Sequence, residues 1–184
     1  MTDKEKDLIN GCKRGIPAYQ EQFYHEYGPM IKGICYRYTG YETEDSKDLF
    51  HDVVVHILTH IGNYKEVSSL TSWVYRTTVN KCIDHYRAMQ LRKTASTDEY
   101  EIDYPEPSRP NDTLSMEQLV TLINQLSPNQ RMVFNLHVVD GYSQEEVTKM
   151  LGLTQSNVRT LISRSKESLR KKIKDYLGKE IEIL

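Results

Sequence analysis

The amino-acid sequence predicts an all-α fold of two small helical domains joined by a flexible acidic linker, with a helix-turn-helix in the C-terminal domain. Apolar residues recur at helical spacing, and no segment alternates apolar and polar residues beside a hairpin turn. Residues 93–113 hold three of the six prolines, six acids and little apolar periodicity. The predicted division is therefore 1–92, 93–113 and 114–184.

The length and composition suit this division. A chain of 184 residues has room for two small cores, and 38% hydrophobic with 27% charged residues is ordinary for globular proteins. No stretch approaches the roughly 18 apolar residues of a membrane span, and MTDKEKDLIN has no apolar signal core, so we expect a cytoplasmic protein. Cys12, Cys35 and Cys82 are widely spaced and are expected to be reduced packing thiols.

The first domain is expected to contain four helices, over residues 3–13, 17–39, 44–61 and 70–92. Pro17 suits the start of the second helix, and Gly28-Pro29 predicts a disturbance within it. Gly40 and Gly62 stand where helices should end.

The second domain is also expected to contain four helices. Its first has a single apolar stripe and closes at Ser127; the stripe comprises Leu119, Leu122, Ile123 and Leu126. Ser127-Pro128-Asn129-Gln130 predicts a capping box with proline at the first helical position, and Ser143-Gln144-Glu145-Glu146 predicts another. The Asp140-Gly141 turn separates these helices, and Gly152 followed by Thr154 as N-cap leads into a long last helix.

Residues 143–165 have the short helix, glycine-bearing turn and second helix of a helix-turn-helix. The last helix has an apolar arc (Val158, Leu161, Ile162 and Leu169) and a roughly opposite polar arc (Ser156, Arg159, Thr160, Ser163 and Arg170). Arginine can pair with guanine bidentately, and serine or threonine can bind base edges or phosphates, so the polar arc suits duplex DNA. For the basic run from Arg170 to Lys174, attraction to phosphate or simple solubility fits as well as specific contact.

Residues 119–172 resemble the fourth conserved domain of bacterial sigma factors, through LSPNQRMVF and GYSQEEVTKMLGLTQSNVRTLISRSKESLRKK. The resemblance implies that this domain reads the minus 35 promoter element. The residues it assigns to that role are Ser156, Asn157, Arg159, Thr160, Ser163 and Arg164. Leu161 stands where family members commonly carry arginine, so their base preference is not transferred.

The first domain is similar to the second conserved region of sigma factors, through DLFHDVVVH at 48–56 and LTSWVYRTTVNKCIDHYR at 70–87. Together the two resemblances identify a member of the extracytoplasmic-function (ECF) class of RNA polymerase sigma factors. Core RNA polymerase and promoter DNA, duplex and single-stranded, are the implied partners. An anti-sigma factor is a further partner of many members, and the sequence leaves open whether this chain has one.

One polar arc of the helix over 70–92 suits unpaired DNA; it comprises Trp73, Arg76, Asn80, Asp84 and Arg87. A tryptophan beside arginines can stack on an exposed base while the cations meet phosphates, although a lone tryptophan is more often a core residue. The resemblance adds the preceding loop, 62–69, as part of a base pocket. The residues predicted to open the minus 10 element are Tyr64, Trp73, Arg76, Asn80 and Arg87.

The helix over 44–61 carries a polar face at i, i+3 and i+4, which the resemblance identifies as the docking site for core RNA polymerase. The predicted residues are Asp48, Leu49, His51 and Asp52. A solvated face is the alternative interpretation.

Two other functions remain as alternatives. A conventional helix-turn-helix regulator would bind palindromic duplex DNA without polymerase. A metal hydrolase would use Asp52, His56 and His60 at i, i+4 and i+8, but Ile57 stands where such a site needs a glutamate. No phosphate loop or nucleophile elbow is present, so we expect no cofactor, no metal and no enzymatic activity.

The linker acids allow two interpretations: mimicry of nucleic-acid charge in a basic polymerase channel, or a flexible spacer. They are Asp98, Glu99, Glu101, Asp103, Glu106 and Asp112.

Overall fold

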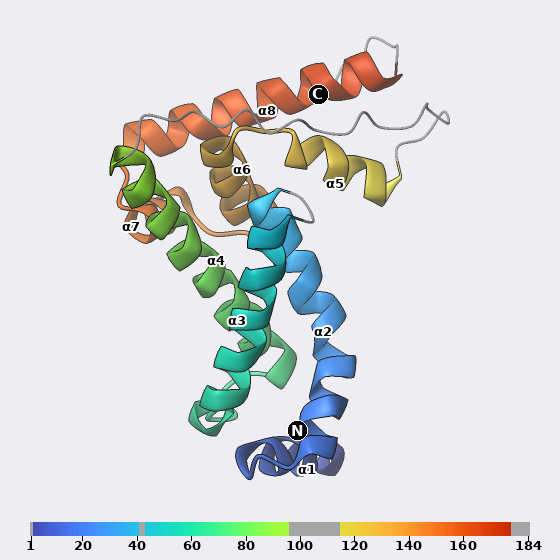
Figure 1. Ribbon diagram of the computed structural model, residues 1–184. Coiled ribbons are helices and arrows are strands. Elements are labelled where there is room, and N and C mark those ends of the chain that lie inside the picture. The colour runs from blue at the N-terminus through green and yellow to red at the C-terminus, as the bar shows by residue number, and fades with distance from the viewer. Residues whose placement is uncertain (1, 41–42, 96–114, 178–184) are drawn as a thin grey trace. The chain divides into compact units, whose positions relative to one another are not determined.

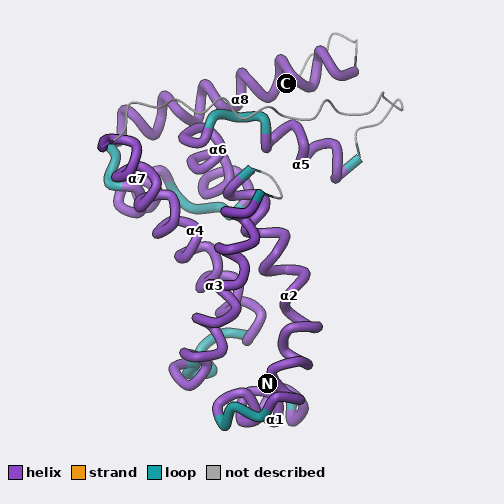
Figure 2. Tube along the Cα trace, viewed as in Figure 1, coloured by secondary structure: helices purple, strands orange, loops and turns teal. Residues whose placement is uncertain are grey.

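The structure, a computed structural model, describes residues 2–40, 43–95 and 115–177 (Figure 1). Every regular element in these ranges is a helix, joined by short loops, and the predicted all-α fold is confirmed (Figure 2). The chain divides into two compact units, Met1–His85 and Tyr86–Leu184. This boundary lies within a helix, ahead of the predicted one at residue 92. The six linker acids all lie outside the described residues, so their role stays a prediction.

The first unit contains three helices and the start of a fourth: α1 (Asp3–Lys13), α2 (Pro17–Thr39), α3 (Glu44–His60) and α4 (Leu70–Ala95). The bounds agree with the four predicted helices to within three residues. A short 3-10 turn, η1 (Ile61–Asn63), follows α3 and contains Gly62. Gly40 ends α2 with φ of 104°, a left-handed conformation that glycine adopts readily.

Pro29 lies inside α2, which continues through it as predicted, and a local disturbance at Gly28-Pro29 stays a prediction. Proline removes one backbone hydrogen bond from the helix interior. Phe23 and Ile31, on either side of it, are completely buried, and α2 packs along α3. This packing keeps α2 helical at the position where the backbone hydrogen bond is missing.

The core of the first unit is formed from all four helices. Its most deeply buried side chains include Leu8, Phe23, Ile31, Val53, Ile57, Ile61 and Val74. Cys12, Cys35 and Cys82 are buried and belong to no disulfide, as expected for packing thiols. Burial of this apolar surface holds the exposed faces of α3 and α4 in place.

The second unit contains the four predicted helices: α5 (Met116–Asn124), α6 (Pro128–Phe134), α7 (Gln144–Leu151) and α8 (Gln155–Leu177). A π-helical segment, η2 (Asn135–Val139), extends α6 and was not predicted. One buried cluster joins α5, α6 and α8; it comprises Leu122, Ile123, Leu126, Phe134 and Leu169.

The start of α6 differs from the predicted capping box. Pro128 is at the first helical position, but the Ser127 side chain makes no capping hydrogen bond. The Ser127 carbonyl instead accepts from the Arg131 amide at 2.8 Å. The Arg131 side chain, 3% exposed, donates through Nη1 to the carbonyls of Asn124 (2.9 Å) and Leu126 (3.1 Å). A buried arginine therefore donates hydrogen bonds to carbonyl groups that the end of α5 leaves without helical partners. The sequence did not predict this contact.

Gly152 is expected to be a stability determinant of the turn between α7 and α8. Its φ of 65° is left-handed, so Gly152→Ala should lower the free energy of unfolding by about 1 kcal/mol. Gly33, exposed inside α2 with open space around an added Cβ, is the matched control. Gly33→Ala should raise the free energy of unfolding by about 0.5–1 kcal/mol. Denaturant unfolding measures both changes, and the same sign for both would contradict the argument.

Candidate functional site

The helix-turn-helix is built by local capping. Ser143 and Glu146 form the predicted box: the Glu146 amide donates to Ser143 Oγ at 3.2 Å, and the Ser143 amide to Glu146 Oε2 at 2.8 Å. The hydrogen bonds from Ser143 lower the pKa of Glu146. Thr154 Oγ1 accepts from the Asn157 amide at 3.2 Å and so caps α8. These contacts fix where both helices begin.

α8 presents a continuous polar face on the surface of the second unit. Val158, Ile162 and Leu169 are buried against the rest of that unit. All six residues predicted for minus 35 reading are exposed: Ser156, Asn157, Arg159, Thr160, Ser163 and Arg164. Their side chains are available to a ligand, and their assignment to DNA stays a prediction.

The basic run near the end of α8 is not uniformly available. Lys172 donates from Nζ to Gln125 Oε1 on α5 at 3.2 Å, so it ties two helices of the second unit together. Arg170, Lys171 and Lys174 are exposed. The structure thus separates a packing lysine from basic residues that face solvent.

The α4 face contains most of the residues predicted for minus 10 opening. Ser69 Oγ accepts from the Ser72 amide at 3.1 Å and caps the helix. Trp73 is half-buried, whereas Arg76 and Asn80 one and two turns further on are exposed. Arg87 is also exposed but belongs to the second compact unit. The first unit therefore brings together Trp73, Arg76 and Asn80.

Tyr64 lies behind this face rather than on it. It is 7% exposed, its hydroxyl donates to the Ser68 carbonyl at 2.5 Å, and its ring centroid is 5.8 Å from that of Trp73. Burial, and then the Glu66 charge, raise the pKa of Tyr64. These contacts favour a role in positioning Trp73 and the loop.

The loop between η1 and α4 has two exposed residues that the sequence did not single out. Val67 is 89% exposed, and Glu66 has a φ of 58°, which is uncommon for a residue with a side chain. Strained conformations of this kind often occur at ligand-binding loops.

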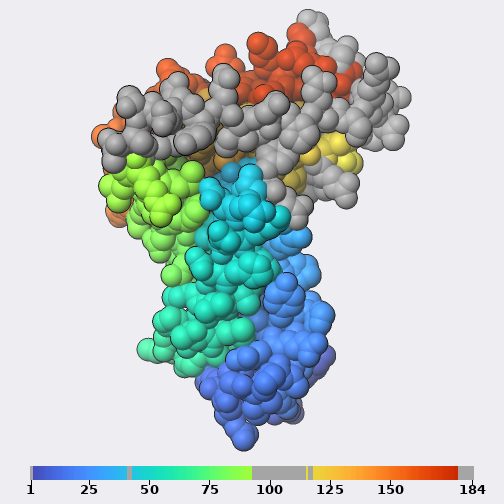
Figure 3. Space-filling view, viewed as in Figure 1, coloured from blue at the N-terminus to red at the C-terminus, as the bar shows by residue number. Residues whose placement is uncertain are grey.

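Asp48, His51 and Asp52 are exposed on α3, as predicted. Figure 3 shows α3, in cyan to teal, on the surface of the first unit. Leu49 is 5% exposed, so it supports the helix from the core instead of lying on that face. Val55, one turn beyond His51, is 63% exposed and was not among the predicted residues.

Comparison with known proteins gives two family matches. Sigma-70 region 2 matches residues 23–92 and sigma-70 region 4 matches residues 116–169, which together span about two thirds of the chain. The ECF sigma factor SigW of Bacillus subtilis is 24% identical over 92% of this chain and 97% of its own length. The ECF sigma factor SigE of Mycolicibacterium smegmatis is 25% identical over 92% of this chain, which covers 65% of SigE.

This chain belongs to the ECF class of RNA polymerase sigma factors. In this sigma factor the region 2 match contains α3, the loop after it and α4 as far as residue 92, and the region 4 match contains α7 and α8 as far as residue 169. A solved relative supports the fold: RpoE of Bartonella quintana, in complex with the anti-sigma factor NepR, aligns with a TM-score of 0.54 and 17% identity. That match covers 84% of this chain and 96% of RpoE.

The histidines of the metal-hydrolase alternative pack against each other in the sigma factor. The ring centroids of His56 and His60 are 4.1 Å apart, and His60 Nδ1 lies 2.8 Å from the His56 carbonyl oxygen. Across the described ranges, no group of three or more potential ligands is arranged around a metal position. Nor does any described helix have the length and apolar character needed to cross a membrane.

His56 is expected to make stability depend on pH. Partial burial, then the positive charges of Lys81 and His60, lower its pKa from 6.5, and Asp84 opposes them. The unfolded chain therefore binds this proton more readily, and stability should fall as the pH drops below 6.5 towards the folded-state value. His56→Asn should flatten this dependence in thermal unfolding. If the melting temperatures of His56→Asn and the parent protein changed with pH in parallel, His56 would not be the source of the pH dependence.

Proposed function

We propose that this sigma factor binds core RNA polymerase, directs it to specific promoters and helps open the DNA. The observation that carries this proposal is the presence in one chain of an exposed α8 polar face and a half-buried Trp73 beside Arg76 and Asn80. The first face suits duplex DNA and the second suits unpaired DNA. A factor that both locates and opens a promoter needs both kinds of surface.

In region 4, α8 is proposed to lie in the major groove at the minus 35 element. Arg159 is placed early on the helix, where it can donate to guanine O6 and N7, and Ser156, Thr160 and Ser163 can reach base edges or phosphates. Asn157 and Arg164 complete the six-residue face. The later basic residues would add contacts to phosphates that carry no sequence information.

In region 2, Trp73 is proposed to stack on a base at the edge of the opened minus 10 element. Arg76 would neutralise a phosphate, and Asn80 would bond a base edge. Tyr64 supports this role from behind, because its ring contacts Trp73 and its hydroxyl holds the loop. Arg87, further along α4, would meet a more distant phosphate.

The α3 face is proposed to dock on core RNA polymerase through Asp48, His51 and Asp52, with Leu49 as its buried support. Asp52→Arg should weaken association with core polymerase about tenfold, since it places a like charge against a basic partner surface. Asp7, which is exposed on α1, provides the control. Asp7→Arg makes the same change of charge at a position outside α3. Fluorescence anisotropy with labelled sigma factor compares the two, and equal affinities for both variants would remove α3 from the docking site.

The proposed action is binding rather than catalysis, and the cytoplasm, where the polymerase transcribes, is the proposed location. An anti-sigma factor is proposed as a further partner because RpoE, which shares the fold, was solved with one. Such a partner would compete with core polymerase.

Size-exclusion chromatography of the full chain with core RNA polymerase, followed by transcription from a promoter library, tests the proposal. Co-elution and initiation at a subset of promoters would support it. Tight binding to palindromic duplex DNA without co-elution would favour the conventional helix-turn-helix regulator instead.

A further inference from the structure

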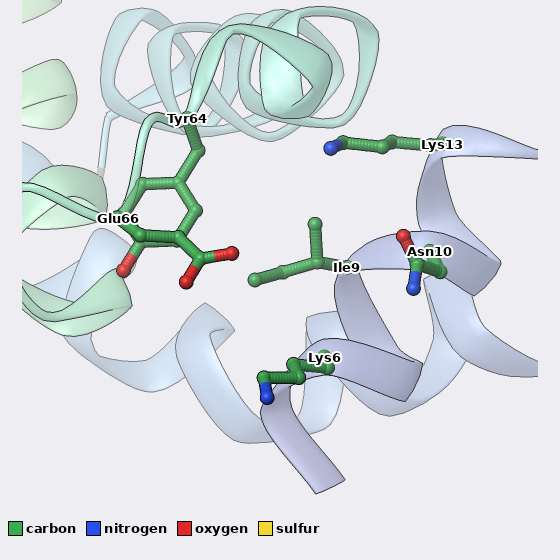
Figure 4. A pocket seen from close by; sticks show the side chains of 6 residues that line it. All are labelled: Lys6, Ile9, Asn10, Lys13, Tyr64 and Glu66. Carbon is green, nitrogen blue, oxygen red and sulfur yellow. The ribbon is translucent and has the colours of Figure 1, made fainter. Parts of the chain in front are cut away.

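A pocket in the first unit lies between α1 and the loop that precedes α4 (Figure 4). Its α1 wall consists of Lys6, Ile9, Asn10 and Lys13, and its loop wall consists of Tyr64 and Glu66. None of the α1 residues belongs to the surfaces described above. The loop wall, by contrast, adjoins Trp73 through Tyr64, whose ring is 5.8 Å away.

The polar groups on the α1 wall are mainly hydrogen-bond donors. Lys6, Asn10 and Lys13 follow one another at i, i+4 and i+7, so one stripe of α1 carries two ammonium groups and an amide. Lys6 Nζ also lies 3.7 Å from Asp3 Oδ1, which makes an ion pair within α1. Among the described residues, no ion pair or side-chain hydrogen bond occupies the Lys13 ammonium, which points across the pocket toward Tyr64 (Figure 4).

The α1 wall is firmly held against the rest of the first unit. A Cβ added at Gly11 would lie 2.1 Å from the Tyr19 ring, which shows how closely α1 and α2 approach. Cys12 Sγ donates to the Tyr19 carbonyl at 3.3 Å on the same side. A preformed wall loses little conformational entropy when it binds a ligand.

We propose that this pocket binds one sugar-phosphate unit of the unpaired DNA strand, next to the nucleotide that contacts Trp73. Lys13, with Asn10 and Lys6, meets the phosphate, while the narrow exposed edges of Ile9 (4% exposed) and Tyr64 (7% exposed) border the sugar. This inference rests on the proposed function, because it extends the path of the strand from α4 to α1. It makes α1 part of the DNA-binding surface.

Glu66 allows a second test, in which the substitution is expected to strengthen DNA binding instead of weakening it. Its carboxylate points into the pocket (Figure 4) and would repel a phosphate there. The carboxylate therefore weakens binding in a way that does not depend on base sequence. Removing its charge should strengthen binding of every strand by a similar factor.

The experiment uses the full sigma factor assembled with core RNA polymerase and dye-labelled single-stranded DNA, both of mixed sequence and as homopolymers of each base. Lys13→Gln should weaken binding about fivefold at low salt, for every strand, and reduce the salt slope by about 0.7, the value for one lost single-strand phosphate contact. Glu66→Gln should tighten binding for every strand. Lys4→Gln removes the same charge from an exposed α1 residue outside the pocket and should leave affinity nearly unchanged.

Equal losses of affinity in Lys13→Gln and Lys4→Gln would contradict phosphate binding in the pocket, because the effect would then depend only on the overall charge of the protein. A change in the ranking of the homopolymers in Glu66→Gln would also overturn it, because the pocket would then hold a base rather than a phosphate. Failure of the proposed function has a different signature: the parent assembly would not form or would not bind single-stranded DNA. Thermal unfolding of each variant checks that α1 is still folded.

Discussion

Trp73→Ala is expected to reduce open-complex formation about 5- to 150-fold while association with core RNA polymerase stays near normal. Trp73 is half-buried beside exposed Arg76, and its remaining surface can stack on an unpaired base. Base-aromatic stacking contributes about 1–3 kcal/mol, which gives the expected range. Permanganate reactivity of unpaired thymines near the minus 10 element measures the opening directly.

Trp73→Phe is the matched variant, because it keeps an aromatic face and should retain part of the opening activity. The Tyr64 ring also packs against Trp73, so thermal unfolding must show that Trp73→Ala leaves the first unit folded. Normal thymine reactivity in a folded Trp73→Ala protein would contradict the stacking role. Loss of polymerase association would instead indicate that Trp73 acts in docking.

Arg159→Ala is expected to cost about 1–3 kcal/mol of binding at a preferred promoter, the usual contribution of one bidentate arginine-guanine pair. Arg159 is exposed on α8, and the neighbouring Val158 is buried, so helix packing fixes the direction of its side chain. The loss should be much smaller at promoters with another base pair at the contacted position. Promoter binding by the assembled holoenzyme, measured across a library, gives the base preference.

Arg159→Lys separates charge from geometry, since lysine keeps the charge but lacks the planar pair of donors. It should restore general affinity without restoring the guanine preference. A uniform loss at every promoter in Arg159→Ala, together with full recovery in Arg159→Lys, would make Arg159 a phosphate contact.

Several features of the candidate sites could be predicted because they depend on short-range pattern. The exposure of Arg159, Thr160 and Ser163 follows from the 3.6-residue period of α8 once Val158 and Ile162 face the core. The same reasoning placed Arg76 and Asn80 on the surface of α4. Leu49 and Tyr64 were less accessible than their predicted roles suggested, because their burial depends on which helices and loops cover them.

The eight α-helices of the described residues, the turn at Gly152 and the resemblance to sigma regions 2 and 4 could be predicted from the sequence, because caps and apolar periodicity act over three or four residues. Three features could be seen only once the chain was folded: Arg131 donates to the end of α5, the Tyr64 ring packs against Trp73, and Lys13 and Glu66 line one pocket. Lys13 and Glu66 are far apart in the sequence and belong to different elements. Long-range packing brings them together, and no local pattern encodes that packing.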